Sequence, residues 1–463
     1  MNARSSASPW AADRFPGRWF VPTMLTQREV HYLHWLTHTW CEGAGRIVEL
    51  GCFLGGSTMA LATGLGANPR AVRPMLTYDA FEMDWFGASI LQHPYKCGER
   101  FRPLFDLYLK DHLHNIVVRE GWIPHNLPRE KEPELYPEQE PVEVLFIDAA
   151  KTWGVHLSIL RTFGRHLVPG KSIVAQQDFK NYYVHWIPLH MHQLRDCFEP
   201  VHDVPLSATY SFRYLGGIEQ HLDRLRRPAD IPVCAIDDTW DEIEAYWEER
   251  SAHETLMTIL LNRATHFANQ KNFEGALAAA KRFVERFPAL AETGAGHPTM
   301  AAQEFERTMD MLDGVAGDDV DRRAAAASLR AAAPKLMRSQ PGAGVTPVHQ
   351  ALWRQVAIRC VEAGIHRIAL YGAGDHTRRL LSSGWPEGRL EVTAIIDDAP
   401  RSPTLRSIPI LRPKDLQTEI DAVILSSDSY EPRLREAATR AFAERSIPII
   451  AMYEPAPLAA TAV

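Results

Sequence analysis

The sequence predicts an α/β protein in which two parallel-sheet domains flank a helical segment. Apolar runs of strand length alternate with helical patterns over residues 46–179 and again over residues 366–453. In both regions the first strand ends in a glycine turn that opens a helix, a connection typical of parallel sheets. Between these regions, residues 237–338 carry apolar side chains at helical spacing.

The first glycine turn lies in the segment RIVELGCFLGGSTMALATGL, residues 46–65. Glycine permits positive φ angles and close approach of a ligand. The helix start offers unpaired N–H groups and a partial positive charge to an anionic or polar ligand. The turn therefore predicts a site for a nucleotide-like molecule, the alternative being a tight connection that binds nothing. The candidate binding residues are Glu49 at the strand end, Gly51 and Gly55 in the turn, and Ser57 and Thr58 in the helix.

Acidic residues recur at the carboxyl ends of the next predicted strands. Leu76–Phe81 contains Asp79, whose carboxylate could accept both hydroxyls of a ribose. Val142–Lys151 contains Asp148, and Gly170–Phe179 contains Asp178, while Asn115–Trp122 forms another strand of the same sheet. Because parallel strands end at one edge, where such sheets bind ligands, these acids are expected on one rim.

Three motifs together resemble the class I S-adenosylmethionine-dependent methyltransferases. They are Glu-x-Gly-x-x-x-Gly-Gly-Ser from Glu49, the aspartate that ends the following strand, and FIDAAK ending at Lys151. The resemblance covers roughly residues 40–220. Within this class, the segment is most similar to the catechol, caffeoyl-CoA and sugar O-methyltransferases. A dinucleotide-binding dehydrogenase fits less well, because Phe53 stands where its second glycine should fall. The resemblance implies S-adenosyl-L-methionine as cofactor, bound by the turn residues above and by Asp79, Gly121 and Asp148.

The same resemblance bears on the chemistry at the end of the fourth strand. Catechol-type enzymes end this strand in Asp-x-x-Lys, which matches Asp148 and Lys151. Methyl transfer requires a proton acceptor for the attacking group. Lys151 can serve if burial or a nearby cation lowers its pKa, the alternative being a solvated loop cation. Asp178 and His185 are further candidates for the base.

Glutamines stand where the related enzymes carry two more metal ligands, namely Gln176 and Gln177. Magnesium prefers carboxylates and water, and neutral amides replace a charged pair poorly. Asp178, one residue further on, could substitute only if the strand carried a bulge. The sequence thus predicts no tightly bound metal, with magnesium dependence as the alternative. The nearby histidines 185, 190 and 192 lack the further ligands of a closed zinc site.

Composition is that of a soluble globular enzyme of 463 residues, with 46% hydrophobic and 23% charged residues. A net charge of −7 offers no electrostatic footprint for nucleic acid or for an anionic membrane. The six cysteines are scattered, which predicts reduced thiols. No run is apolar enough for a signal peptide or a membrane span, and a cytoplasmic location is expected.

The predicted organisation divides the chain into a methyltransferase-like domain at 1–225, a helical segment at 237–338, a linker at 339–347 and a last domain at 348–456. Ser207–Ile218 fits the antiparallel edge of the first sheet. Two helices separated by Asn269–Asn272 and ending at Phe287–Pro288 resemble one tetratricopeptide-like hairpin. One such unit cannot bury its own face, so it should pack on a neighbouring domain or on another subunit in a homo-oligomer.

The last domain is predicted to be a second, smaller Rossmann-like unit. Its first strand leads into a Gly-Ala-Gly turn at Gly372 and Gly374, and the next strand ends near Asp397. The third glycine of the dinucleotide pattern is replaced by Thr377. The domain resembles those of sugar C-methyltransferases and sugar-modifying acyltransferases, which implies a nucleotide or nucleotide-sugar ligand. A structural module without ligand is the alternative.

Two functions remain open on the sequence alone. In the first, the protein transfers a methyl group from S-adenosylmethionine to a hydroxyl of a sugar or of a sugar-containing small molecule. In the second, it is a non-catalytic nucleotide-binding or scaffold protein with a degenerate methyltransferase fold. The sequence identifies neither the acceptor nor, with certainty, whether oxygen, nitrogen or carbon is methylated.

Overall fold

The computed structural model describes residues 9–10, 15–16, 21, 23–71, 73–83, 97–205, 207–250, 253–292, 298–332 and, with short gaps, 353–452. The chain divides into two compact units, each taken by itself below. Unit 1 comprises Met1–Val21, Leu25–Phe81 and Pro103–Gln340, and unit 2 comprises Pro22–Met24, Glu82–Arg102 and Pro341–Val463. The predicted linker at 339–347 lies outside the described residues.

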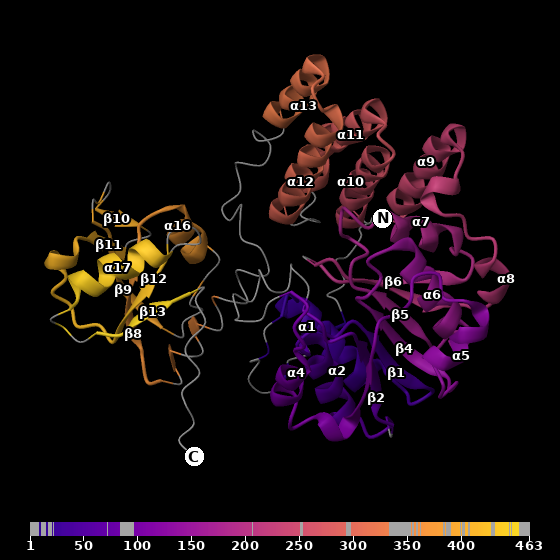
Figure 1. The fold of residues 1–463 in the computed structure, drawn as a ribbon, viewed down its shortest axis with the longest axis horizontal. Helices are drawn as coiled ribbons and strands as arrows, with labels where there is room; N and C mark the ends of the chain where they lie inside the picture. The colour runs from indigo at the N-terminus through magenta and orange to yellow at the C-terminus, as the bar shows by residue number, and fades with distance from the viewer. Residues whose placement is uncertain are drawn as a thin grey trace. The chain divides into compact units, whose positions relative to one another are not determined.

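Unit 1 contains a seven-stranded sheet in the order β3-β2-β1-β4-β5-β7-β6 (Figure 1). The five strands from β1 to β5 are parallel, and β7 runs antiparallel to both β5 and β6. The strands are β1 (Arg46–Leu50), β2 (Met75–Asp79), β3 (Ile116–Glu120), β4 (Val142–Ile147), β5 (Ile173–Gln176), β6 (Phe198–Asp203) and β7 (Tyr210–Tyr214). This confirms the predicted parallel α/β sheet.

One expectation about the sheet was wrong, and one strand was not predicted. The strand predicted within Ser207–Ile218 is β7, which is not the edge, because β6 pairs with its outer side. The strand β6 escaped prediction since its mixed sequence FEPVHD lacks an apolar alternation. The strand β5 pairs with β4 in unbroken register from Ile173 to Gln176 and carries no bulge. Asp178 therefore lies beyond the strand, in the turn that follows it.

Two helices of unit 1 begin at a threonine whose hydroxyl caps them. Thr26 opens the first helix with a capping box, since its hydroxyl accepts from the backbone N–H of Glu29 and the Glu29 carboxylate accepts from Thr26. Thr152 caps the helix after β4 in the same position. The helices up to residue 222 are α1 (Gln27–Trp35), α2 (Gly56–Ala67), α4 (Arg102–Tyr108), α5 (Glu132–Leu135), α6 (Trp153–Gly164), α7 (Trp186–Gln193) and α8 (Glu219–Leu222).

Five helices follow, α9 (Val233–Glu249), α10 (His253–Asn269), α11 (Phe273–Glu292), α12 (Pro298–Ala316) and α13 (Val320–Ala332). The predicted break at Asn269–Asn272 is confirmed, whereas the predicted end at Phe287–Pro288 is wrong, because α11 continues to Glu292. The tetratricopeptide likeness stays a prediction. Among the described residues, no helix combines the length and the apolar composition needed to cross a membrane.

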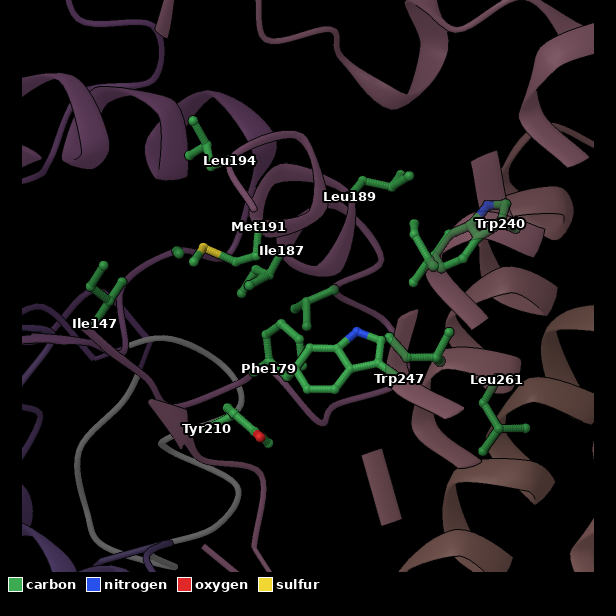
Figure 2. Close-up of a cluster of buried hydrophobic side chains, with 14 of the residues drawn as sticks. Ile147, Phe179, Ile187, Leu189, Met191, Leu194, Tyr210, Trp240, Trp247 and Leu261 are labelled. Carbon is green, nitrogen blue, oxygen red and sulfur yellow. The ribbon is translucent and has the colours of Figure 1, made fainter. Parts of the chain in front are cut away.

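The helical segment shares one hydrophobic core with the sheet. Trp247 of α9 lies between two rings of the sheet side, with centroid distances of 5.4 Å to Phe179 and 5.0 Å to Tyr210. Figure 2 shows these rings together, with Leu261 of α10 on the helical side. The face that a lone hairpin would expose is thus buried within the same chain.

Unit 2 holds a six-stranded sheet in the order β10-β11-β9-β8-β12-β13. Its strands are parallel except for the hairpin partner β10. The elements are β8 (Arg367–Tyr371), α16 (Asp375–Ser382), β9 (Glu391–Ile396), β10 (Thr404–Leu405), β11 (Ile408–Leu411), β12 (Ala422–Leu425), α17 (Glu431–Ala441) and β13 (Ile449–Ala451).

Candidate functional site

The glycine turn after β1 requires glycine at two positions. Gly51 has φ +88°, and a Cβ there would approach the backbone of Asp148 and Ala149 to 3.0 Å. Gly55 has φ +92° and stands immediately before α2. Positive φ is costly for other residues, and the close approach of the ends of β1 and β4 excludes a side chain. The turn thus begins directly beside the backbone of Asp148.

Glu49 is the buried acid beneath this turn, with no exposed surface. Its Oε2 accepts hydrogen bonds from the hydroxyls of Thr58 (2.6 Å) and Thr77 (2.7 Å). Its Oε1 has no hydrogen-bond partner among the described residues. Burial raises the pKa of Glu49 to about 7 against the effect of nearby hydroxyls, and the negative charge of Asp148 adds to the rise. An acceptor with spare capacity suits a ligand that carries an ammonium group.

Asp79, the last residue of β2, supports the turn from the side. Its Oδ2 accepts from the backbone N–H groups of Cys52 (3.0 Å) and Phe53 (2.8 Å), and its Oδ1 accepts from that of Phe81 (2.7 Å). Burial raises the pKa of Asp79 above its ordinary value, although these N–H groups oppose the rise. Because a carboxylate has about four lone-pair sites and three of them are used here, Oδ1 can still accept from one ribose hydroxyl.

The end of β3 carries the predicted Gly121 and, next to it, Trp122, which sequence reasoning missed. Gly121 has φ +151° and donates its N–H to the carbonyl of Asp79 (2.9 Å), which aligns the ends of β2 and β3. The next residue, Trp122, is 70% exposed. A tryptophan directly after a predicted strand could have indicated this residue from the sequence, since aromatic faces stack on nucleobases.

Lys151 joins two of the predicted catalytic acids. Its Nζ donates to Asp148 Oδ1 at 2.7 Å and to Asp178 Oδ2. Burial lowers the pKa of Lys151, but the two carboxylates outweigh it and hold this pKa well above its usual range. Burial and the neighbouring Asp178 raise the pKa of Asp148, against the opposing effect of Lys151. These directions disfavour Lys151 as a base and favour a carboxylate.

His185 lies in a different setting from the one expected of a base. It is buried at the start of α7, and its ring centroid is 5.1 Å from that of His266 on α10. Burial, assisted by His266, lowers the pKa of His185 to about 3. Its neighbour Trp186 donates its indole N–H to Ala150 (3.0 Å), so this aromatic segment adjoins the Asp148–Lys151 loop. The setting disfavours His185 as a proton acceptor near neutral pH.

The two glutamines at the end of β5 differ in their hydrogen bonding, since the Oε1 of Gln176 has no partner among the described residues. Gln176 is fully buried and its Nε2 lies 2.9 Å from His156 Nε2. Gln177 donates to Glu29 Oε1 (3.0 Å) and accepts from the hydroxyl of Thr209 (2.7 Å). Within the described part of the chain, no group of three or more His, Cys, Asp or Glu residues could hold a metal ion. With Lys151 on both free carboxylates, this donor set does not fit magnesium.

Glu29 is a second residue that sequence reasoning missed. It comes from α1, yet its negative charge contributes to the raised pKa of Asp148, and it also accepts from Thr209 (2.8 Å). The spacing of Thr26 and Glu29 is that of a capping box, which is a readable signal for a helix start. Its second role at the site depends on the packing of α1 against β5 and β7, which no local pattern reveals.

Unit 2 repeats the turn-and-acid arrangement on a smaller scale. Asp397 follows β9 and its Oδ2 accepts from the backbone N–H of Ala373 (3.0 Å). Gly372 has φ +113°, and a Cβ there would lie 3.0 Å from the Ser426 carbonyl, whereas one at Gly374 would meet nothing within 4 Å. Thr377, in place of the third glycine, donates to the Gly372 carbonyl. The predicted residues are thus brought together at one turn.

Comparisons with known proteins give only structural likenesses. No family model matches the chain, and no curated protein matches it. Among solved structures, the O-methyltransferase NovP is 14% identical with a TM-score of 0.30, covering 42% of this chain and 83% of its own. CalS11, a TDP-rhamnose 3'-O-methyltransferase, is 18% identical with a TM-score of 0.30, covering 40% and 78%. The SAH-bound Podospora anserina methyltransferase PaMTH1 is 15% identical with a TM-score of 0.28, covering 42% and 80%. These scores carry no argument about activity, which rests below on this chain's own residues.

Proposed function

We propose that the protein is an S-adenosylmethionine-dependent methyltransferase acting on a hydroxyl of a sugar or of a sugar-containing small molecule. One observation carries the proposal. The glycine turn with Glu49 follows β1, the Asp148–Lys151–Asp178 group follows β4 and β5, and β1 pairs directly with β4. A cofactor cradle and a group of charged side chains therefore share one edge of a parallel sheet, where such sheets bind ligands.

The cofactor half of the site is supported by its hydrogen-bonding capacity. The unpartnered Oε1 of Glu49 suits the ammonium of the methionine end, and the N–H groups at the start of α2 suit its carboxylate. Asp79 Oδ1 suits a ribose hydroxyl, and the exposed face of Trp122 suits the adenine ring. Gly121 keeps Asp79 and Trp122 at neighbouring strand ends.

The acceptor half requires a proton acceptor and a charge that orients the attacking oxygen. Bound S-adenosylmethionine would supply an electrophilic methyl group for the acceptor oxygen, and its sulfur would keep the electron pair of the broken C–S bond. Asp148 takes the hydroxyl proton, which its raised pKa favours. Lys151, cationic between two carboxylates, donates a hydrogen bond to the acceptor oxygen. No metal ion takes part in this scheme.

Unit 2 has a supporting role in the proposal. The turn at Gly372 and the carboxylate of Asp397 form a second candidate site for a nucleotide or a nucleotide-sugar. Binding there would retain an acceptor that carries a nucleotide. The helical segment, packed on the sheet of unit 1, would support the acceptor side of the site rather than serve only as a spacer.

Isothermal titration with S-adenosylhomocysteine tests the cofactor assignment directly. We expect one site per chain, weakened in Asp79→Ala. Incubation with S-adenosylmethionine and a panel of sugars and nucleotide-sugars, read by mass spectrometry as a gain of one methyl group, tests the reaction. We expect Lys151→Ala to lower turnover and to leave cofactor affinity nearly unchanged. Absence of cofactor binding to the wild-type protein would favour the alternative of a nucleotide-binding scaffold.

A further inference from the structure

The charged group at the acceptor side is built around one ammonium. Lys151 Nζ lies between Asp148 and Asp178, which come from the ends of the neighbouring strands β4 and β5. The side chain of Asp178 is only 11% exposed, whereas that of Lys151 is 50% exposed. A carboxylate so poorly hydrated needs a cation beside it. Two of the three N–H groups of Lys151 meet this need, and the third lies outside these two ion pairs.

Among the described residues, the two glutamines beside this group are held in the core. The Gln177 amide uses both its ends, toward Glu29 and toward Thr209, and all three side chains are buried. The Gln176 amide is turned to His156 in the core. The Gln177 amide could reach a metal only by abandoning buried hydrogen bonds, which would leave a polar group without a partner. The Gln176 Oε1 has no hydrogen-bond partner among the described residues, but a neutral amide oxygen replaces a carboxylate ligand poorly.

We propose that the Lys151 ammonium is the resident cation of this site, and that it holds the position between Asp148 and Asp178 that a divalent ion would otherwise take. The inference deepens the proposed function, on which its catalytic meaning rests. Lys151 is then a fixed positive charge that orients an acceptor oxygen, and a carboxylate is the base. The site excludes divalent ions because an ion between the carboxylates would lie against the ammonium.

Removal of the Lys151 ammonium changes the net charge of this site. With Lys151 in place, the two carboxylates and the ammonium sum to one negative charge. Without it, two negative charges face each other at adjacent strand ends, which is an arrangement that favours a divalent cation with oxygen ligands and water. Lys151→Ala should therefore create a Mg²⁺ or Mn²⁺ site that the wild-type protein lacks.

Titration with Mn²⁺, followed by the electron paramagnetic resonance signal of the free ion, tests this without cofactor, substrate or turnover. We expect no saturable binding to the wild-type chain at millimolar Mn²⁺ and one bound ion per chain in Lys151→Ala, at least about tenfold tighter. Wild-type binding as tight as that of the variant would overturn the inference, and so would an absence of binding to a folded variant.

Two matched variants locate the effect. Lys151→Arg keeps the cation and should bind no Mn²⁺, whereas Lys151→Ala combined with Asp178→Asn should lose the gained site. Thermal unfolding gives a second readout, since Mg²⁺ should raise the Tm of Lys151→Ala and leave that of the wild-type protein unchanged. Mn²⁺ bound equally by Lys151→Arg would show that charge does not exclude the ion. These outcomes are independent of whether the protein binds S-adenosylhomocysteine, so failure of the proposed function would be recognised separately.

Discussion

The carboxylate of Asp79 accepts a 2.8 Å hydrogen bond from the backbone N–H of Phe53, which joins the end of β2 to the turn after β1. Phe53 has φ +47°, a conformation that a non-glycine residue adopts at some cost. The acid proposed to bind the ribose therefore also holds the turn proposed to bind the methionine end. Cofactor binding and the order of the turn depend on the same side chain.

Asp79→Ala is expected to weaken S-adenosylhomocysteine binding and to lower the free energy of unfolding by about 1–3 kcal/mol, because it leaves buried N–H groups without an acceptor. Titration calorimetry and urea unfolding measure the two effects. Asp111→Ala, at an exposed position, is the matched control and should change neither. Unchanged affinity in a folded Asp79→Ala protein would remove Asp79 from the cofactor site.

Cofactor affinity should depend on pH through Glu49. Because its pKa is about 7 in the folded protein, the carboxyl is partly protonated near neutrality. An ammonium ligand prefers the ionised form, so the affinity for S-adenosylhomocysteine should rise with pH up to about 7 and then level off. The Glu49→Gln variant should bind S-adenosylhomocysteine more weakly than the wild-type protein, and its affinity should not rise with pH. A wild-type affinity that is flat between pH 6 and 8, about one unit either side of the pKa, would contradict the assignment.

The free energy of unfolding should depend on pH in the opposite direction, also through Glu49. The folded pKa of about 7 lies above the ordinary 4.5, so the native state binds more protons than the unfolded state between these values. The contribution of Glu49 is therefore fully present below pH 4.5 and is lost as pH rises toward 7. Asp79 and Asp148, whose pKa values are also raised, act in the same direction. Subtracting the Glu49→Gln unfolding curve from that of the wild-type protein isolates the Glu49 component.

Trp122→Ala should weaken cofactor binding by about tenfold, since stacking of a base on an aromatic face contributes about 1–3 kcal/mol. Stability should change little because Trp122 is 70% exposed. Leu215→Ala, at another exposed apolar position, serves as control. Equal binding by both variants would show that the adenine lies elsewhere.

Lys180 anchors the segment after β5 to the helical segment. Its side chain is 1% exposed and its Nζ pairs with Asp203 of β6 (2.6 Å) and Glu254 of α10 (3.2 Å). Lys180→Met should lower the free energy of unfolding by about 3 kcal/mol, because it removes the cation that faces the buried Glu254 and the partly exposed Asp203. Lys171→Met, at a 55% exposed residue paired with Glu42 at 3.7 Å, should cost less than about 1 kcal/mol. Equal urea midpoints for the two variants would be inconsistent with this anchoring.

Asp397→Asn should weaken binding of a nucleotide-sugar to the full chain and leave S-adenosylhomocysteine binding unchanged. Asp421→Asn is a matched control, because Asp421 also accepts from backbone N–H groups, those of His366 and Arg367, but at the amino end of β8. Nucleotide-sugar binding that is lost in Asp421→Asn alone would place the ligand at the other end of the sheet.

The parallel strands and the glycine turns could be predicted because they depend on local rules. An apolar run such as VEVLFI has few alternatives to a buried strand, and Gly51 and Gly55 are needed where φ is positive. Local rules failed at β6, whose residues become a strand only because β7 offers a free edge. They failed again at Pro288, which α11 accommodates.

The sequence by itself determined which residues stand at the carboxyl edge of the first sheet, because strand ends follow from pattern and parallel strands end together. Only the tertiary structure decided what those residues do to one another. From the sequence, Lys151 could be either a base or a solvated cation. In the structure, the two carboxylates that it bridges make it a fixed cation. His185 was readable as a base, and its burial against α10 lowers its pKa. Charge and burial at a site are sums over neighbours distant in sequence, so they exist only once the chain has folded.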